Sequence, residues 1–286
     1  MSALRIVSYN IHKGRSGLIS RARLNELRLG LYGLNADLMF LQEVQGRNDR
    51  AAGLDAQHES LAAALHCEVA YGCNAVRRYT DHGNALLSRF PIVGHENQNI
   101  SDHRLEQRGL LHARVQVQAH EVHCFVVHLG LFGVSRGRQL EALIERIGAS
   151  VPADAPMLIA GDFNDWTGEL SGVLVQRLQL HEVFSSAEHT RGAGLPRLQE
   201  TVRLLRESMA QAGRPPELRR RPAPRLGAGL PVQARPPRTF PSAMPFFRLD
   251  RIYQRGFAVR RASVLRGSPW VTISDHAPLL AELELP

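Results

Sequence analysis

The stretch Met157-Leu-Ile-Ala-Gly-Asp-Phe-Asn-Asp165 is an apolar run that passes abruptly into acidic and amide side chains. Met157–Ala160 has the length and composition of a buried strand. Side chains alternate between the two faces of a strand, so Asp162 and Asn164 are predicted to share a face. A carboxylate beside a carboxamide can orient a water molecule and hold an oxyanion. A turn rich in Asp and Asn explains the same composition, and this stretch alone leaves both interpretations open.

Short apolar runs of this kind alternate with helical patterns along the chain. Leucines recur at i, i+3, i+7 and i+10 in Arg21–Leu34, which predicts a helix. Leu111–Val117 and Val122–Leu129 follow each other across the short turn Gln118–Glu121, which predicts an antiparallel pair. The remaining predicted strands are Leu4–Tyr9, Leu38–Leu41, Asn84–Leu87, Met157–Ala160, Leu249–Tyr253 and Leu279–Leu283, with further helices at Arg138–Ile147 and Ser60–Leu65. This order predicts an α/β fold with mixed sheets.

Composition describes a folded body with one unusual segment. Of the 286 residues 44% are hydrophobic, which supports a sizeable core and excludes a wholly disordered chain. The longest apolar stretches are far shorter than the roughly 18–20 residues of a membrane span. Three cysteines, an odd number without paired spacing, do not indicate a zinc site.

The formal charge of +8 is concentrated in residues 191–238. That segment holds 11 Arg, 3 Glu, no Lys, no Asp and eight of the 16 prolines, so it accounts for the whole net charge. We therefore expect a single domain over residues 1–286 with a basic, Pro/Arg-rich insert at about 191–238. Within the insert, residues 196–213 have the start and stop signals of a helix, and residues 214–237 are typical of a loop.

Polar residues stand at the ends of other predicted strands as well. Asn10 closes the first strand in Ser8-Tyr-Asn-Ile-His-Lys-Gly14, and Glu43 follows an apolar strand in Leu41-Gln-Glu-Val44. Asn and Glu oxygens are ligands that suit Mg²⁺. Taken alone, Glu43 is more often a surface acid, and His128 in an apolar strand is more often a buried core histidine.

Two motifs near the C-terminus combine a carboxylate with an imidazole. Asp250 begins the strand in Leu249-Asp-Arg-Ile252, and Ser274-Asp275-His276 precedes the last apolar strand. Such a pair fixes the tautomer of the ring and raises the imidazole pKa, so that the ring stays protonated near neutral pH. A protonated imidazole suits a phosphate group.

Taken together and in order, these motifs resemble the endonuclease/exonuclease/phosphatase superfamily, which includes DNase I, exonuclease III-type abasic-site endonucleases, inositol polyphosphate 5-phosphatases and neutral sphingomyelinases. The resemblance extends from Ser8 to about Leu280, with residues 191–238 unmatched. The motifs that carry it are Tyr9-Asn10, Gln42-Glu43, Gly83-Asn84-Ala-Leu-Leu-Ser88, His128, Gly161-Asp-Phe-Asn164, Leu249-Asp250-Arg-Ile252 and Ser274-Asp275-His276. It implies a four-layered α/β sandwich, with two mixed sheets packed face to face and helices outside. It also implies hydrolysis of phosphate esters that depends on Mg²⁺, with Mn²⁺ as a substitute.

The resemblance further implies roles by position. Glu43 would be the main metal ligand with Asn10 beside it, and Asp275 would hold the same metal or a second one. Asp162 would orient or deprotonate the attacking water, and Asn164 would bind that water or a phosphate oxygen.

The remaining positions concern the phosphate group. His276, held by Asp250, would contact the phosphate, and His128 would contact it or assist the leaving group. Four residues are secondary candidates for support or substrate binding: Asn84, Ser274, Arg108 and Lys13. For Lys13 a solvated loop lysine is the more common interpretation.

The motifs leave the substrate open. A phosphodiesterase of the nuclease type is favoured, with a phospholipid-headgroup or inositol-phosphate hydrolase at a membrane surface as the alternative and a non-catalytic binding module disfavoured. The insert would bind nucleic acid, lie on anionic lipid, or dock on its own domain. The N-terminal residues have no apolar segment typical of an export signal, so we expect a cytoplasmic protein. The sequence leaves the oligomeric state open.

Overall fold

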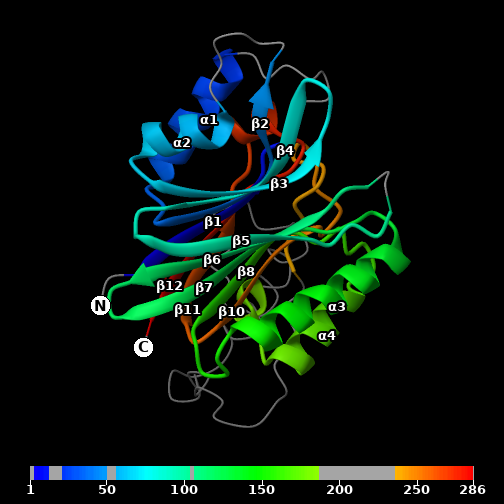
Figure 1. The fold of residues 1–286 in the computed structure, drawn as a ribbon. Coiled ribbons are helices and arrows are strands. Elements are labelled where there is room, and N and C mark those ends of the chain that lie inside the picture. The colour runs from blue at the N-terminus through cyan, green and yellow to red at the C-terminus, as the bar shows by residue number, and fades with distance from the viewer. Residues whose placement is uncertain (1–2, 13–20, 50–55, 104–105, 187–235, 286) are drawn as a thin grey trace, which may run out of the picture. The chain divides into compact units, whose positions relative to one another are not determined.

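Two six-stranded mixed sheets stacked face to face form the centre of the protein (Figure 1). The computed structural model describes residues 3–12, 21–49, 56–103, 106–186 and 236–285. The first sheet runs in the order β11 (Ala258–Val264), β12 (Leu279–Glu284), β1 (Leu4–Asn10), β2 (Leu38–Asn48), β4 (Thr80–Ser88), β3 (Glu68–Val76). The second runs β5 (Ile92–Asn99), β6 (Gly109–Val117), β7 (His120–His128), β8 (Met157–Asp162), β10 (Asp250–Arg255), β9 (His181–Glu182).

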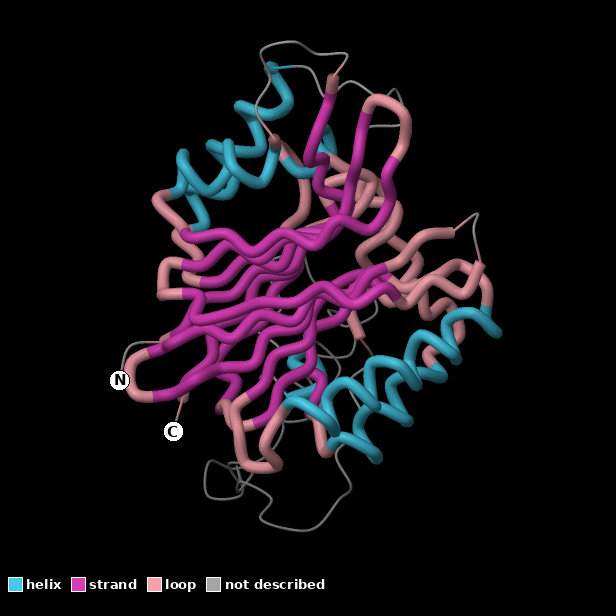
Figure 2. The backbone as a smooth tube through the Cα atoms, viewed as in Figure 1, coloured by secondary structure: helices cyan, strands magenta, loops and turns pink. Residues whose placement is uncertain are grey.

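Helices cover the outer face of each sheet. Three pack on the first sheet: α1 (Arg21–Leu34), α2 (Gln57–Leu65) and the short α7 (Trp270–Ile273). The second sheet is covered by α3 (Gly133–Ser150) and α4 (Glu169–Leu178), and the short α5 (Val183–Ser186) follows β9. Figure 2 shows the strands of both sheets lying between the two groups of helices. The predicted four-layered α/β sandwich is confirmed.

Strand alternation explains why the layers hold together. In β2, Leu38 and Phe40 point into the core between the sheets, while Met39 and Leu41 point outward into the core shared with α1 and α2. All four side chains are fully buried. A strand segment that is buried on both faces needs apolar residues at every position, and this is the pattern of Leu38–Leu41, the first part of β2.

Most of the predicted elements are confirmed, some with longer or shifted bounds. The helix at Arg21–Leu34 has the predicted limits, and β6 pairs with β7 in antiparallel fashion. The elements that the sequence pattern missed are β3, β5, β9, β11, α4, α5 and α7. The missed strands include every edge strand of the two sheets. The predicted helix at residues 196–213 lies outside the described residues, as do residues 191–235 of the insert.

Among the helices in the described ranges, none has both the length and the apolar character that a membrane span requires.

Candidate active site

Strand register places three polar residues in one row across the second sheet. Asp162 at the end of β8 lies opposite His128 of the parallel strand β7 and opposite Asp250 of the antiparallel strand β10. Neighbouring strands are about 4.8 Å apart, so residues that share a row come into contact. Three motifs from a stretch of more than 120 residues, His128 to Asp250, thus meet at one edge of the sheet.

A glycine allows Asp162 to occupy this place. Gly161 has a φ of +152°, and a Cβ there would lie 1.9 Å from the carbonyl oxygen of Val127 on the adjacent strand. Past the strand end, the backbone N–H of Asn164 donates to Asp162 Oδ1 at 3.0 Å. The Asn164 side chain donates through Nδ2 to the carbonyl oxygen of Leu129 at 2.9 Å. The turn therefore holds one oxygen of the Asp162 carboxylate and leaves the other to the site.

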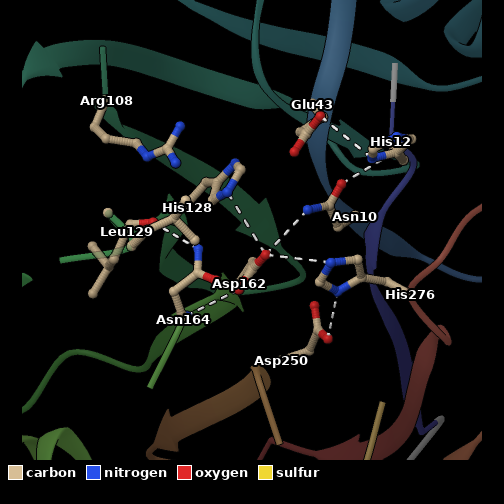
Figure 3. A network of polar contacts seen from close by, with 12 residues as sticks. Asn10, His12, Glu43, Arg108, His128, Leu129, Asp162, Asn164, Asp250 and His276 are labelled. Carbon is tan, nitrogen blue, oxygen red and sulfur yellow. Dashed lines mark hydrogen bonds and ion pairs between the residues drawn. The ribbon is translucent and has the colours of Figure 1, made fainter. Parts of the chain in front are cut away.

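That second oxygen, Asp162 Oδ2, is the centre of the site (Figure 3). Asn10 Nδ2 donates to it at 3.1 Å, and the Nε2 atoms of His128 and His276 lie 3.7 and 3.6 Å away. Asp162 is buried, and this burial raises the pKa of its carboxyl group to about 6 in spite of the neighbouring His276. The carboxylate is ionised at neutral pH but is more basic than an exposed aspartate.

His276 bridges two carboxylates. Its Nδ1 lies 2.9 Å from Asp250 Oδ2 and its Nε2 faces Asp162. Burial by itself lowers the pKa of the ring, but the charges of Asp250 and Asp162 outweigh it and raise the pKa of His276 to about 10. The backbone N–H of Asp250 in turn contacts the Thr239 hydroxyl at 3.4 Å. His276 is therefore held as a cation at neutral pH.

Asp162, Asp250 and His276 also have the ligand types of a metal site, since one ligand atom of each lies within 4.8 Å of the others. Both ring nitrogens of His276, however, already face a carboxylate oxygen. A protonated ring carries an N–H at each of these nitrogens, and we therefore interpret these three residues as an ion-pair network.

Ser274 ties the C-terminal loop to the end of β1. Its hydroxyl donates to the carbonyl oxygen of Asn10 at 2.7 Å and accepts from the backbone N–H of His276 at 3.1 Å. One buried side chain thus fixes both Asn10 and His276 relative to Asp162.

A second group of oxygen donors lies beside this network. The pairing of β2 with β4 shifts in register between Leu41 and Val44, and Glu43, with a φ of 55°, lies in this bulge. Glu43 Oε2 and Asp275 Oδ1 approach the same atom, His12 Nδ1, at 3.9 and 3.4 Å. Asn10 Oδ1 accepts from the backbone N–H of His12 at 3.0 Å. Two carboxylates and an amide oxygen thus lie next to the same residue, His12, and they are ligand types that suit Mg²⁺ or Mn²⁺.

The residues of this site lie within a stretch of the chain that matches a known protein family. The model of the Endonuclease/Exonuclease/phosphatase family matches residues 7–276. The chain belongs to this family. Family members are phosphoester hydrolases and are generally metal-dependent, so membership supports hydrolysis of phosphate esters as the reaction class.

Relatives cover the full length of this family member. It is 33% identical over 291 residues to the uncharacterized protein YbhP of Escherichia coli (strain K12), with 99% of this chain and 97% of YbhP covered. A family structure from Bacteroides vulgatus matches with a TM-score of 0.70 at 14% identity and covers 100% of both chains. The Bacteroides thetaiotaomicron mannosyl-6-phosphatase matches with a TM-score of 0.65 at 16% identity, covering 99% and 100%. At these low identities, the similarity to the two structures supports the fold of this chain and nothing further.

The secondary candidates occupy different places in this family member. Asn84 is buried and donates through Nδ2 to the carbonyl oxygens of Gly109 at 3.0 Å and Val126 at 3.2 Å, so it links the two sheets. The Arg108 side chain lies on the His128 side of the site in Figure 3 and is held by Glu106 at 3.2 Å. Lys13 lies outside the described residues.

Sequence reasoning did not single out His12, although the structure places it between Glu43 and Asp275. The signal was present. His12 lies two residues after Asn10, and the same alternation that relates Asp162 to Asn164 relates Asn10 to His12. The sequence also gave no indication of the roles of the Leu129 carbonyl group and the Thr239 hydroxyl, because the residue type does not reveal such contacts.

Proposed function

We propose that this protein is a Mg²⁺-dependent phosphodiesterase, in which Asp162 activates a water molecule and protonated His276 binds the phosphate. The observation that carries the proposal is the single oxygen Asp162 Oδ2, shared by Asn10, His128 and His276.

The ionisation of the two central groups supports these roles. A general base has to be unprotonated at the working pH and still basic enough to accept a proton. A carboxylate whose pKa burial has raised to about 6 meets both conditions. His276 remains positively charged well above neutral pH because two carboxylates face it, and a cationic ring stabilises the negative charge that accumulates on phosphate oxygens.

Glu43, Asp275 and the Asn10 amide oxygen are the residues that would hold the metal ion. A bound Mg²⁺ supplies positive charge next to the phosphate oxygens. Asn10 would serve both parts of the site, since its oxygen faces the donor set and its Nδ2 fixes Asp162. An in-line displacement requires a placed water and donors around the phosphate, and it requires no covalent nucleophile.

The modest positive charge of the site favours a diester over a monoester. A phosphodiester carries one negative charge, whereas a phosphate monoester carries about −1.5 to −2 at neutral pH. Within the described residues, the cations that lie around Asp162 are His276 and, on the His128 side, Arg108. The only lysine of the chain is Lys13.

The test compares bis(p-nitrophenyl) phosphate with p-nitrophenyl phosphate as substrates of the full chain. Turnover of the diester is expected with Mg²⁺ or Mn²⁺, with loss in EDTA and recovery on adding metal back. Asp162→Asn and His276→Gln should each lower turnover by at least about a hundredfold. Asp154→Asn, at an exposed aspartate near the other end of β8, is the matched control and should change nothing. Diester turnover that persists in EDTA or in Asp162→Asn, or a clear preference for the monoester, would contradict the proposal.

A further inference from the structure

Three exposed apolar side chains follow directly after the strand that carries His128. Leu131, Phe132 and Val134 are 54%, 61% and 72% exposed, and we call them the apolar tip. They lie where β7 leads into α3, whose first residue is Gly133. Within the described residues, no other four-residue stretch exposes three large apolar side chains. Apolar side chains that gather on a surface in this way indicate a binding surface.

The backbone of the apolar tip is held by side chains of the protein. Gln139 Oε1 accepts from the N–H of Gly130 at 2.7 Å, and Glu106 Oε1 accepts from the N–H of Leu131 at 2.9 Å. The Arg136 guanidinium donates to the carbonyl oxygens of Gly130 and Leu131. These backbone groups keep their partners when water is excluded, and a segment that enters an apolar medium needs such partners.

The surroundings of the tip carry positive charge. Residues 129–140 contain two arginines and no acidic residue. The first turn of α3 has neither an acidic residue nor a side-chain cap, so the positive end of the helix dipole lies at the tip. Two acids of the neighbouring loop contribute little net negative charge, because Asp102 pairs with Arg138 at 2.6 Å. Glu106 likewise pairs with Arg108 at 3.2 Å.

Apolar side chains beside positive charge are the combination that a lipid surface with anionic headgroups accepts. A nucleic acid can also take up an apolar wedge, but it requires several cations in contact with its phosphates. The residues outside 191–238 have no net charge and do not offer such a surface. A protein partner usually covers about 800 Å² on each side, far more than three partly exposed side chains provide. An anionic lipid surface fits both the apolar character and the charge of the tip.

Insertion of the tip would bring the active site to the level of the lipid phosphates. Leu131 follows His128 by three residues, which span at most about 11 Å when fully extended. Between them, the carbonyl oxygen of Leu129 accepts from Asn164 Nδ2 at 2.9 Å, so the tip is joined to the site (Figure 3). The headgroups of a bilayer occupy about 5–8 Å on each side of the hydrocarbon core. A tip residue at the edge of that core therefore places His128 close to the headgroups.

We propose that the apolar tip inserts into a lipid surface that contains anionic lipids, with the active site facing the headgroups. The proposal goes beyond the proposed function, because insertion requires no turnover and is measured as binding. The two proposals can therefore fail independently of each other.

Vesicle binding by the full chain tests the tip. Vesicles of phosphatidylcholine with about 30% phosphatidylglycerol are compared with vesicles of phosphatidylcholine alone, and bound protein is separated by sedimentation in EDTA. Binding to the anionic vesicles is expected to be at least about threefold tighter at low salt. At about 0.5 M NaCl this preference should shrink because salt screens the charges, while the apolar part of the binding remains.

The double variant Leu131→Ser with Phe132→Ser assigns the binding to the tip. It removes two apolar side chains without adding charge, and serine is favoured at the N-cap position that Phe132 occupies, so the fold should be retained. Binding to anionic vesicles should fall at least about tenfold at both salt concentrations. The matched control, Leu29→Ser with Tyr32→Ser, removes two side chains of α1 that are 73% and 62% exposed. The control should change binding less than about twofold, and melting temperatures check that both variants fold.

Each result decides the proposal. Absence of vesicle binding by the unaltered chain, or undiminished binding in the Leu131 and Phe132 double variant, would refute insertion by the tip. An equal loss in the Leu29 and Tyr32 control would show non-specific apolar adsorption and would overturn the proposal as well. A dimer, or binding of duplex DNA, that only the tip variant abolishes would assign the tip to a second copy or to nucleic acid instead. Turnover of bis(p-nitrophenyl) phosphate by the unaltered chain decides the proposed function separately.

Discussion

Replacing Asp250 by asparagine tests the electrostatic core of the site. The substitution keeps the shape of the side chain and removes the charge that lies 2.9 Å from His276 Nδ1. An unperturbed histidine has a pKa of about 6.5, so a pKa raised to about 10 corresponds to about 5 kcal/mol in favour of the protonated ring. Asp250 is the nearer of the two carboxylates that contribute to this, and Asp162 lies 3.6 Å away. We expect Asp250→Asn to lower the pKa of His276 by at least about 2 units, or about 3 kcal/mol.

The stability change has a definite sign. His276 has a higher pKa in the folded protein than in the unfolded chain, so its contribution to stability is complete below about pH 6.5 and is lost as the pH rises through about 10. Asp250→Asn should therefore reduce the free energy of unfolding by about 3 kcal/mol at pH 6 and by much less near pH 10. Turnover should fall at least about a hundredfold, because the ring loses the partner that keeps it charged and oriented.

The decisive assay is an NMR titration of the His276 ring in EDTA-treated protein, assigned with His276→Gln, together with urea unfolding at both pH values. Asp154→Asn, at an exposed aspartate, is the control and should shift neither measurement. A His276 pKa that does not move, or an equal loss of stability at pH 6 and pH 10, would show that Asp250 does not hold the histidine in its charged form.

Three further predictions concern Asp162, Asn84 and His112. Asp162→Asn should lower turnover by about 10²- to 10⁴-fold. It should nevertheless melt at an equal or higher temperature at pH 8. Burial raises the pKa of this carboxyl group to about 6, so its ionised form is unfavourable above that pH and its removal does not destabilise the protein. Asn84→Ala should cost about 2–3 kcal/mol in urea unfolding, since two backbone carbonyls lose their donor, but change turnover less than about twofold. Burial and the adjacent His123 lower the pKa of His112 to about 4, so the free energy of unfolding should fall by about 2 kcal/mol between pH 6.5 and pH 5, and His112→Leu should flatten this slope.

The strands that the sequence pattern predicted are those with neighbours on both sides. β2 and β8 are buried on both faces and are continuous apolar runs, which are easy to recognise. The edge strand β5, with the sequence Ile-Val-Gly-His-Glu-Asn-Gln-Asn, is largely exposed and has no apolar alternation. Its pairing with β6 depends on backbone hydrogen bonds, which form with almost any residue type. Hydrophobic periodicity therefore predicts the interior of each sheet and misses its borders.

The site was predictable for a related reason, and only in part. His128, Asp162 and Asp250 each interrupt or end an apolar run, and the register of β7, β8 and β10 then brings them together. The aromatic contact between Trp166 and Phe247 had no such signal. Trp166 and the Phe240–Phe247 segment lie in loops, where no periodicity relates a residue to its partner, and only the folded chain shows that they meet.

Backbone conformation distinguishes residues that belong to the site from ordinary surface residues at strand ends. Glu43, Asn164 and His12 all have positive φ values, of 55°, 47° and 39°. Non-glycine residues adopt this region infrequently and at some cost in free energy. A surface acid at a strand end has no need of it, because a regular strand would place its side chain in solvent equally well. In Glu43 the bulge instead turns the carboxylate toward His12, which Asp275 also approaches. In Asn164 the turn places its N–H on Asp162. Of the seven described non-glycine residues with positive φ, the other four end helices or lie in the turn between β6 and β7, whereas these three make contacts within the site. At these three positions no helix end or hairpin turn accounts for the unfavourable conformation, and the contacts of the site do.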